Sequence, residues 1–507
     1  MKKMILILPA LLLAGGIGIF WLVNSMMPKG EERISYNKEQ QTAQIDKQLA
    51  GLDLDKIRAK ENLIMEKSIE EIQSAIIQGK LSYEELTAFY LDRIRTYDAG
   101  EQGLNAVAEI NPKAVEQARA HDASPDKGKN MTGIPVLLKD NINTNDMPTS
   151  GGTYALKDFV PAKNAPLVER LLENGAVILG KSNLSELANF MDTRMPSGYS
   201  SKAGQTHNPF DPVLLSPSGS SSGSGAAVAA NLSAVAIGTE TTGSIIAPSA
   251  IHSIVGFKPT KDAILAQGVI PLSSTMDTAG PMAKTVKDAI LLYNALVADP
   301  SKQLSLELDA DFLKGRRIGL IGEKHEDKLI SKLKMAGATV VSIRLDESGI
   351  DNEFIINQDF RSDLNHYLTT YDAPVKTLDQ LIDFNKKDMG RRAKYGQDLI
   401  EEANDVQKID RTKTASIVAQ AKARLNQALE EHKLDAIVFI DNEGVIMPAV
   451  AGYPEVTVPM GALEDGTPRG ATFIAREHDD ETLMRIAYSF EQNTKDRMIP
   501  EKYKEKS

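Results

Sequence analysis

Short apolar runs recur along this chain, and stretches with a helical pattern separate them. Apolar runs without alternating polar residues are typical of strands that are buried on both faces of a sheet. They lie at residues 134–138, 176–179, 317–321, 339–343, 436–440, 455–458 and 471–475. This alternation predicts an α/β fold, a single large domain with a central, mostly buried mixed β-sheet covered by helices on both faces.

Two helix starts are marked by Ser-x-x-Glu capping boxes, at Ser68 and Ser82. In such a box the serine and the glutamate satisfy each other's backbone N–H groups at the first turn. The second helix carries apolar side chains on one face, which we expect to pack on the main body: Leu86, Phe89, Tyr90 and Ile94. Residues 346–414 are charged and mostly helical in pattern, so we expect them to form a wall or lid over the site.

The first residues of the chain differ from the rest. Lys2 and Lys3 precede residues 4–23, which carry no charge. A stretch of this length is about enough to cross a hydrocarbon core of roughly 30 Å, so we predict a membrane anchor or signal segment over residues 1–28. The cleavage site at residues 23–26 is poor, which favours the anchor. The two lysines then place the remaining chain outside the cytoplasmic membrane, whereas a cleaved segment would give a secreted protein.

The totals exclude several classes of function. The formal net charge is −11, and no basic stretch is interleaved with aromatic residues, so nucleic acid is not an expected partner. The absence of cysteine excludes thiol nucleophiles, disulfides and cysteine-based metal sites. Residues 29–65 are polar and charged and are predicted to be a spacer, which leaves residues 66–507 as the main domain.

Residues 216–248 combine two serine-bearing loops with one short apolar connection. The stretch begins with a Ser/Gly cluster and closes on Gly-Thr-Glu-Thr-Thr-Gly-Ser-Ile. A Ser/Gly cluster alone is typical of a flexible linker. Here, however, it runs directly into a small-residue helix at 224–231 and a short strand at 234–237. We therefore expect its glycines to allow backbone N–H groups to approach a ligand or side chain closely.

The expected chemistry needs a base other than histidine. None of the seven histidines belongs to a Gly-x-Ser-x-Gly elbow or an His-Glu-x-x-His helix, so the usual signals of Ser-His-Asp and zinc sites are missing. Lys139 directly follows the apolar run 134–138. It is either a surface lysine at a strand end or a buried one, and burial would let it be neutral near pH 7 and accept a proton.

Several motifs together resemble the amidase signature family. They are Gly-Ile-Pro-Val-Leu-Leu-Lys-Asp-Asn around Lys139, the Ser/Gly cluster at 218–223 and residues 238–245. Further matching stretches lie at 179–183, 185–188, 206–211, 256–260, 277–281 and 451–456, and all these motifs occur together in the family's order. The similarity extends over most of residues 68–500. It implies the amidase signature fold for residues 66–507 and hydrolysis of carboxamide bonds.

The resemblance also implies a Ser-Ser-Lys triad. Ser244 corresponds to the nucleophile, Ser220 to the bridging serine and Lys139 to the base, while Ser221 and Ser222 stay open as alternatives for the bridging position. No metal or cofactor is implied. The expected oxyanion hole consists of the backbone N–H groups of Thr241, Thr242, Gly243 and Ser244.

One departure from the family's pattern bears on the substrate. Many members have an arginine two residues after the nucleophile, where this chain has Ile246. An arginine would pair with a substrate carboxylate, whereas Ile246 predicts a pocket for an uncharged or apolar acyl group. The motifs look closest to the peptide-amidase-like branch, whose members remove C-terminal amides from peptides. We therefore expect a peptide C-terminal amide or a small neutral amide as the substrate.

Two alternatives stay open. The chain could be the glutaminase A subunit of a tRNA-dependent amidotransferase, which belongs to the same family; Ile246 and residues 4–23 oppose this. It could also be a catalytically silent binding protein of the same fold, which the filled triad positions oppose.

Overall fold

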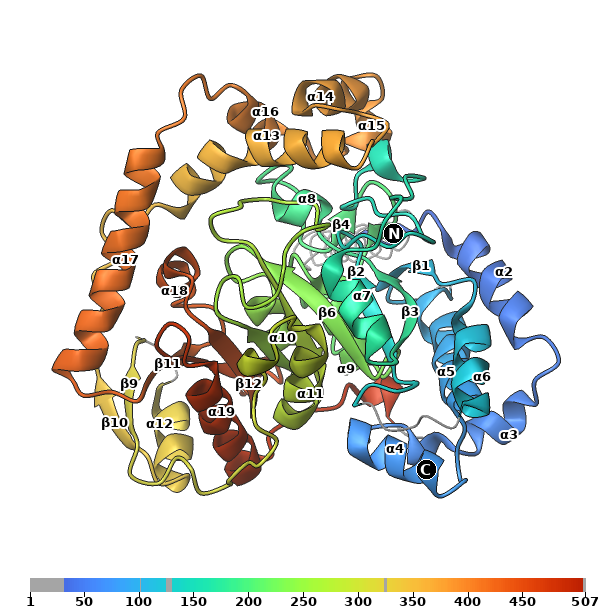
Figure 1. Ribbon diagram of the computed structural model, residues 1–507, viewed down its shortest axis with the longest axis horizontal. Coiled ribbons are helices and arrows are strands. Elements are labelled where there is room, and N and C mark those ends of the chain that lie inside the picture. Colours follow the sequence, from blue (N-terminus) through green and yellow to red (C-terminus); the bar gives the residue numbers. More distant parts are fainter. Residues whose placement is uncertain (1–31, 101, 125–129, 323–325, 505–507) are drawn as a thin grey trace, which may run out of the picture.

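The computed structural model describes residues 32–100, 102–124, 130–322 and 326–504. Within these residues the chain forms one eleven-stranded sheet with helices on both faces (Figure 1), which confirms the predicted α/β fold. The strands, in their order across the sheet, are β1 (Val107–Ile110), β3 (Val177–Ser182), β2 (Pro135–Lys139), β6 (Val235–Glu240), β8 (Thr278–Ala283), β7 (Val255–Lys258), β12 (Glu455–Ala462), β13 (Pro468–Ile474), β11 (Ala436–Ile440), β9 (Arg317–Leu320) and β10 (Thr339–Ser342).

The sheet is mixed. β2 pairs in parallel with both β3 and β6, and β9 pairs in parallel with β10 and β11. The remaining pairs, including β6 with β8 and β12 with β13, are antiparallel. Because β2 and β6 run in the same direction, Lys139 at the end of β2 lies at the edge of the sheet where the chain leaves β6 toward Ser244.

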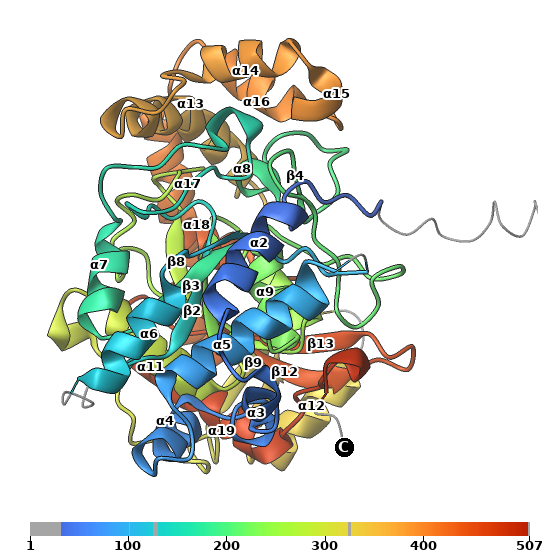
Figure 2. The same cartoon turned by 90° about the vertical axis from the view of Figure 1, so that its right-hand side faces the viewer.

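Helices pack on both faces of the sheet, as the turned view in Figure 2 also shows. Strand β11 illustrates this: Ala436, Val438 and Ile440 belong to one apolar core, and Ile437 and Phe439 to a second core on the opposite face. The helices are α2 (Lys38–Leu49), α3 (Leu54–Arg58), α4 (Ile69–Ile77), α5 (Tyr83–Arg93), α6 (Ala114–Ala123), α7 (Pro166–Glu173), α8 (Glu186–Asn189), α9 (Ser222–Ala229), α10 (Ile246–Ile251), α11 (Val286–Leu296), α12 (Glu326–Met335), α13 (Asn352–Thr370), α14 (Leu378–Lys386), α15 (Met389–Arg392), α16 (Asp398–Asn404), α17 (Arg411–Glu431), α18 (Ile446–Ala451) and α19 (Asp480–Thr494).

Both predicted capping boxes are present. Ser68 and Ser82 each accept a hydrogen bond from the backbone N–H three residues on, and the glutamate at that position returns one, at the starts of α4 and α5. The predicted apolar face of α5 is buried. These local signals were readable because both partners of a capping box lie within one turn.

The predicted spacer at residues 29–65 differs from what the structure shows. Helices α2 and α3 lie in this stretch, and Ile45, Leu49 and Ile57 are buried in the main core. The Tyr36 N–H also donates to Ala203 O at 3.2 Å. The apolar residues of this stretch are sparse, so the sequence pattern did not predict that it packs on the domain.

The predicted membrane attachment is corrected. None of the helices within the described ranges is long and apolar enough to cross a bilayer. The longest, α17, carries charged side chains along its length, which are costly in hydrocarbon. Residues 4–23, on which the anchor, signal and cell-membrane or secreted location were predicted, lie outside the described residues.

The charged stretch 346–414 is helical, as predicted, and packs over the loops that follow the strands. Helices α13 to α16 lie together at the top of Figure 1. Tyr367 of α13 donates its hydroxyl to Asn143 Oδ1 at 2.5 Å, just beyond the end of β2. The Leu399 N–H donates to Met191 O at 3.2 Å. This helical layer therefore forms one wall above the edge of the sheet where Lys139 lies.

Candidate active site

Lys139 ends strand β2 inside the protein. Its side chain has no exposed surface, and its Nζ lies 2.8 Å from Ser220 Oγ and 2.9 Å from Thr239 O. Burial lowers the pKa of Lys139 to about 7, while the carboxylates of Asp277 and Glu240 act in the opposite direction. A lysine in this state is partly neutral near pH 7 and can accept a proton.

The three neighbouring serines have different contacts. Ser220 follows a cis Gly219–Ser220 peptide bond, and its hydroxyl meets Lys139. Ser221 donates its hydroxyl to Thr239 O at 3.1 Å and accepts the Thr239 N–H at 3.3 Å. Ser222 begins α9 and donates to the backbone oxygen of Ser218. The hydroxyls of Ser221 and Ser222 thus hold the loop, and that of Ser220 is positioned beside the lysine.

The small residues of α9 allow this close packing. A Cβ added at Gly223 would lie 2.2 Å from Ala106 O and 2.7 Å from Asn183 N, well inside contact distance. All residues of α9 are buried. The glycine-rich composition therefore serves close packing and not linker flexibility. At Gly223 the close neighbours are backbone atoms, whereas the sequence predicted approach to a ligand or side chain.

Ser244 lies in a tight turn directly after β6. Gly243 before it has a φ of +73°, a left-handed conformation that favours glycine. The Ser244 carbonyl accepts the Ser221 N–H at 3.1 Å, which brings this turn against the serine cluster. Ser244 is 6% exposed, so the residue is buried but retains some accessible surface.

Glu240 stabilises this turn through hydrogen bonds, a role that the sequence did not predict. Its Oε2 accepts the N–H groups of Ile245 at 2.6 Å and Ile246 at 3.0 Å. These are the first two residues after Ser244, so the carboxylate fixes where the chain turns into α10. Its place inside the Gly-Thr-Glu-Thr-Thr-Gly-Ser-Ile motif was the available signal.

Asp277 supports the same turn from its other side. It accepts the Thr241 hydroxyl at 2.5 Å and the N–H groups of Leu272 and Ser273 at 2.7 and 3.0 Å. Burial raises the pKa of Asp277 to about 6, although these hydrogen bonds favour the ionised form. The sequence placed Asp277 in a family motif but did not predict that it contacts the turn.

Ile246 is fully buried at the start of α10. It belongs to the second apolar core, together with side chains from the wall helices and from the loops around the turn, among them Leu187, Phe190, Met191, Val445 and Met447. The second position after Ser244 thus offers apolar surroundings and no cationic group of its own.

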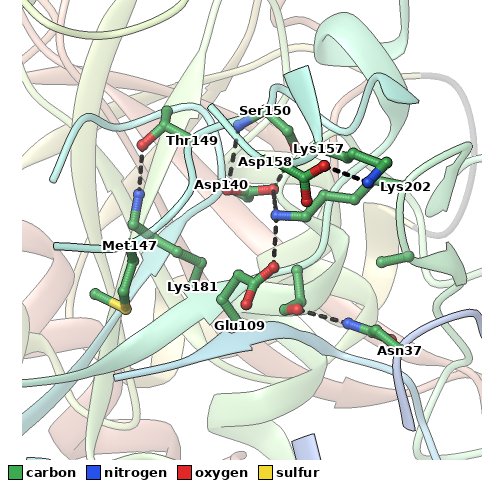
Figure 3. A network of polar contacts seen from close by, with 12 residues as sticks. Asn37, Glu109, Asp140, Met147, Thr149, Ser150, Lys157, Asp158, Lys181 and Lys202 are labelled. Carbon is green, nitrogen blue, oxygen red and sulfur yellow. Dashed lines mark hydrogen bonds and ion pairs between the residues drawn. The ribbon is translucent and has the colours of Figure 1, made fainter. Parts of the chain in front are cut away.

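A buried network of charges underlies the loop that follows Lys139 (Figure 3). Lys202 Nζ lies 3.0 Å from both Glu109 Oε1 and Asp140 Oδ2, and Asp140 Oδ2 accepts the Ser150 hydroxyl at 2.5 Å. Burial lowers the pKa of Lys202, but the two carboxylates outweigh it and raise the pKa above the ordinary value. The network therefore fixes Asp140, the neighbour of Lys139, in the fold.

Lys181 of β3 is a second buried lysine near this network (Figure 3). Its Nζ donates to Thr149 Oγ1 at 2.9 Å and to Ile142 O at 2.5 Å. Burial lowers the pKa of Lys181 to about 8. Its partners are a hydroxyl and a carbonyl of the loop that follows Lys139, so it ties that loop to β3. In the part of the chain that the structure describes, no group of three or more His, Asp or Glu side chains is arranged to hold a metal ion.

Comparison with known proteins identifies the family. The family model described as Amidase matches residues 85–439. A probable amidase of Arabidopsis thaliana is 35% identical, covering 86% of this chain and 92% of its own length. The crystal structure of an amidase family protein from Bacillus anthracis is 42% identical, with a TM-score of 0.90, and covers 94% of this chain and 100% of its own.

A solved peptide amidase from Stenotrophomonas maltophilia is also similar. It is 37% identical, with a TM-score of 0.80, and the match covers 86% of this chain and 98% of that one. The matched family segment contains Lys139, Ser220 and Ser244, and the fold is the same over nearly the whole length of both solved structures. The chain therefore belongs to the amidase signature family and is an amide hydrolase.

Proposed function

We propose that this chain hydrolyses the C–N bond of neutral carboxamides, either peptide C-terminal amides or small neutral amides, through an acyl-enzyme on Ser244. The products are a carboxylate and ammonia or an amine. The observation that carries the proposal is the 2.8 Å contact between Ser220 Oγ and the fully buried Lys139 Nζ, whose pKa of about 7 suits a base.

The proton path runs through both serines. Neutral Lys139 takes the proton of Ser220, and Ser220 takes that of Ser244 as the Ser244 oxygen attacks the amide carbon. When the tetrahedral intermediate collapses, the C–N bond breaks and the same path returns the proton to the leaving nitrogen, which would otherwise depart as a poor amide anion. Water then attacks the acyl carbon and loses a proton through Ser220 to Lys139. When this second intermediate collapses, the bond to the Ser244 oxygen breaks, Ser244 regains a proton along the same path, and the carboxylate product leaves.

The turn after β6 supplies the oxyanion site in this mechanism. The backbone N–H groups of residues 241–244 face the developing oxyanion, and each typically contributes about 2.7–4 kcal/mol to transition-state stabilisation. Glu240 occupies the next two amides, those of Ile245 and Ile246. Asp277 anchors the Thr241 hydroxyl. The turn is thus preorganised before a substrate binds.

Ile246 supports a neutral acyl group. Its apolar core leaves no partner at this position for a substrate carboxylate, and a buried unpaired charge is costly. The similarity to a peptide amidase supports peptide amides within this class. The same feature disfavours glutamine, the substrate expected of an amidotransferase glutaminase subunit.

A hydrolysis screen tests the substrate. Peptide amides, aliphatic amides, aryl amides and glutamine are compared at equal concentration, with ammonia or amine release as the readout. We expect neutral amides to be turned over well above glutamine. Preference for glutamine would refute the proposed substrate class and favour the glutaminase alternative.

Covalent labelling tests the nucleophile. A fluorophosphonate is expected to label Ser244 in the folded wild-type protein but not in Ser244→Ala, and peptide mapping identifies the modified residue. A folded wild-type protein with no adduct on Ser244 would contradict the acyl-enzyme mechanism and favour a silent binding protein.

A further inference from the structure

A cavity lies beside Asp277, which supports the turn that carries Ser244. It has a volume of about 360 Å³ and opens between α13 and the loop of residues 261–277. This volume falls within the range of roughly 300–1,000 Å³ that is typical of small-molecule sites. Asp277 lines it, whereas Lys139, Ser220 and Ser244 do not. The cavity is thus a separate space that shares one residue with the supports of the nucleophile turn.

The walls of this cavity connect to both halves of the proposed catalytic machinery. Gly268, in its wall, accepts the Asn143 N–H at 2.8 Å, and the neighbouring Ile270 N–H donates to Asn141 O at 2.8 Å. Asn141 and Asn143 follow Lys139 in the chain. Asp277, through Thr241, contacts the turn that carries Ser244. A ligand in the cavity would therefore contact residues that are hydrogen-bonded directly to the segment after Lys139 and to the turn that carries Ser244.

The lining is aromatic and acidic. Tyr367 and Tyr371 lie with their ring centroids 4.9 Å apart and form one wall. Asp277 and the half-buried Asp363 contribute carboxylates. The Asp363 Oδ2 accepts the backbone N–H of Ser274 at 2.7 Å, and the side chain of Ser274 also interacts with this carboxylate.

The nearby cations are already paired with other carboxylates. Lys261, which lines the cavity, has its Nζ 2.6 Å from Asp262 Oδ1. Arg411, which acts on Asp363 from α17, is bound to Asp359. His366 lies exposed at the rim. Lys261 acts electrostatically on Asp277, and Arg411 on Asp363. Among the described residues, however, neither carboxylate forms an ion pair within 4 Å, which favours a cationic ligand.

We propose that this cavity binds a small organic ammonium ion with an apolar body, and that its occupancy lowers turnover. Carboxylates beside aromatic rings are the usual recognition elements for such cations. A bound cation competes with the Thr241 hydroxyl for the Asp277 carboxylate and so loosens the anchor of the nucleophile turn. Amines released by amide hydrolysis belong to this chemical class, but the binding site itself does not depend on the proposed substrate.

Titration calorimetry of the full chain with 2-phenylethylammonium chloride tests the binding. We expect the neutral 2-phenylethanol and the anionic 3-phenylpropanoate to bind roughly tenfold more weakly or not at all. Prior labelling with a fluorophosphonate leaves binding of the ammonium ion unchanged if the site is separate from Ser244. Equal binding of the neutral alcohol, or loss of binding after labelling, would overturn the proposal.

Variants locate the site. Thr370→Trp fills the mouth of the cavity from an exposed helix position and should abolish binding, whereas Thr369→Trp, exposed but outside the lining, should not. Asp363→Asn should weaken binding roughly five- to tenfold, and the exposed Asp372→Asn should have no effect. Binding that survives Thr370→Trp would refute the location.

Turnover tests the coupling. For an amide that the enzyme hydrolyses, kcat is measured with and without saturating 2-phenylethylammonium. The ligand should lower kcat of the wild type and of Thr369→Trp, and it should not change kcat of Thr370→Trp. Binding without any change in wild-type kcat would refute the coupling. If no amide is hydrolysed, the proposed function fails while the calorimetric titration still decides the binding site.

Discussion

Replacing Asp277 with Asn should move the pH dependence of turnover, because this carboxylate acts on the proposed base. Burial lowers the pKa of Lys139 to about 7, and Asp277 is the larger of the two carboxylate influences that oppose the change, ahead of Glu240. Removing its charge takes away support for the ammonium form. The pKa of Lys139 therefore falls further, and the amine stays neutral at lower pH.

The size of the effect follows from simple electrostatics. A unit charge several ångströms away at an effective dielectric constant of about 20 contributes on the order of 1–2 kcal/mol, which corresponds to a shift of about one pKa unit. With a pKa of about 7, Lys139 is roughly 10% neutral at about pH 6 and roughly 90% neutral at about pH 8. Asp277, with a pKa of about 6, is itself only about half ionised at pH 6, so the wild type already has part of this effect there. Lys139 should be about half neutral at pH 6 in Asp277→Asn, and relative activity at that pH should rise about twofold.

The assay is kcat/KM against pH for a neutral amide, since this parameter reports the ionisation of the free enzyme. The wild type should show activity that rises with pH through about 7. In Asp277→Asn the plateau should be lower, because the Thr241 anchor is weakened, and the acid limb should lie at lower pH. Asp363→Asn is the matched control and should leave the limb in place. Measurable turnover with an unmoved acid limb in Asp277→Asn would refute the electrostatic reasoning.

Further variants test other parts of the structure. Lys139→Met should abolish amide hydrolysis yet raise the thermal unfolding midpoint, because burying a lysine costs about 1.4 kcal/mol per unit by which its pKa is depressed; retained hydrolysis would exclude Lys139 as the base. Ile246→Arg should raise kcat/KM for amides that carry a free carboxylate relative to neutral ones, and an unchanged ratio would argue against the pocket assignment. Lys202→Met should lower the free energy of unfolding by about 3–5 kcal/mol, because Glu109 and Asp140 lose their buried partner; denaturant unfolding with no loss of stability would contradict this. Gly223→Ala should destabilise strongly, because the added Cβ meets Ala106 O at 2.2 Å, and a wild-type unfolding midpoint would contradict the close approach.

Much of the sheet could be predicted from the sequence, but strands and helices without a clear apolar pattern could not. The run at 436–440 corresponds to β11, because a strand buried on both faces is apolar at every position. β7 and β8 were missed, since their sequences contain Gly, Pro and Lys residues that interrupt such a pattern. The sequence predicts a spacer where the structure has the helices of residues 38–58, because their buried apolar residues are few.

The candidate site divides in the same way. The position of Lys139 after an apolar strand left open whether the lysine is at the surface or buried, and the structure places it with no exposed surface. Its role as the base was implied by the family resemblance and stays a prediction. Which serine faces it was open among Ser220, Ser221 and Ser222, since adjacent residues of one composition are equivalent until the chain is folded. The hydrogen bond from Lys139 to Ser220 spans 81 residues of sequence.

Local order in this protein is thus encoded by residues close together in the chain. Capping boxes, apolar runs and the glycine before Ser244 each act within a few residues, so the sequence alone determined the element types and the identity of the family. The contacts of Asp277 with Thr241 and of Lys202 with Glu109 join segments far apart in sequence. These contacts, and the cavity beside Asp277, depend on the order of the strands in the sheet and on the packing of α13 over the loops. They form only in the complete fold, so no local sequence pattern predicts them.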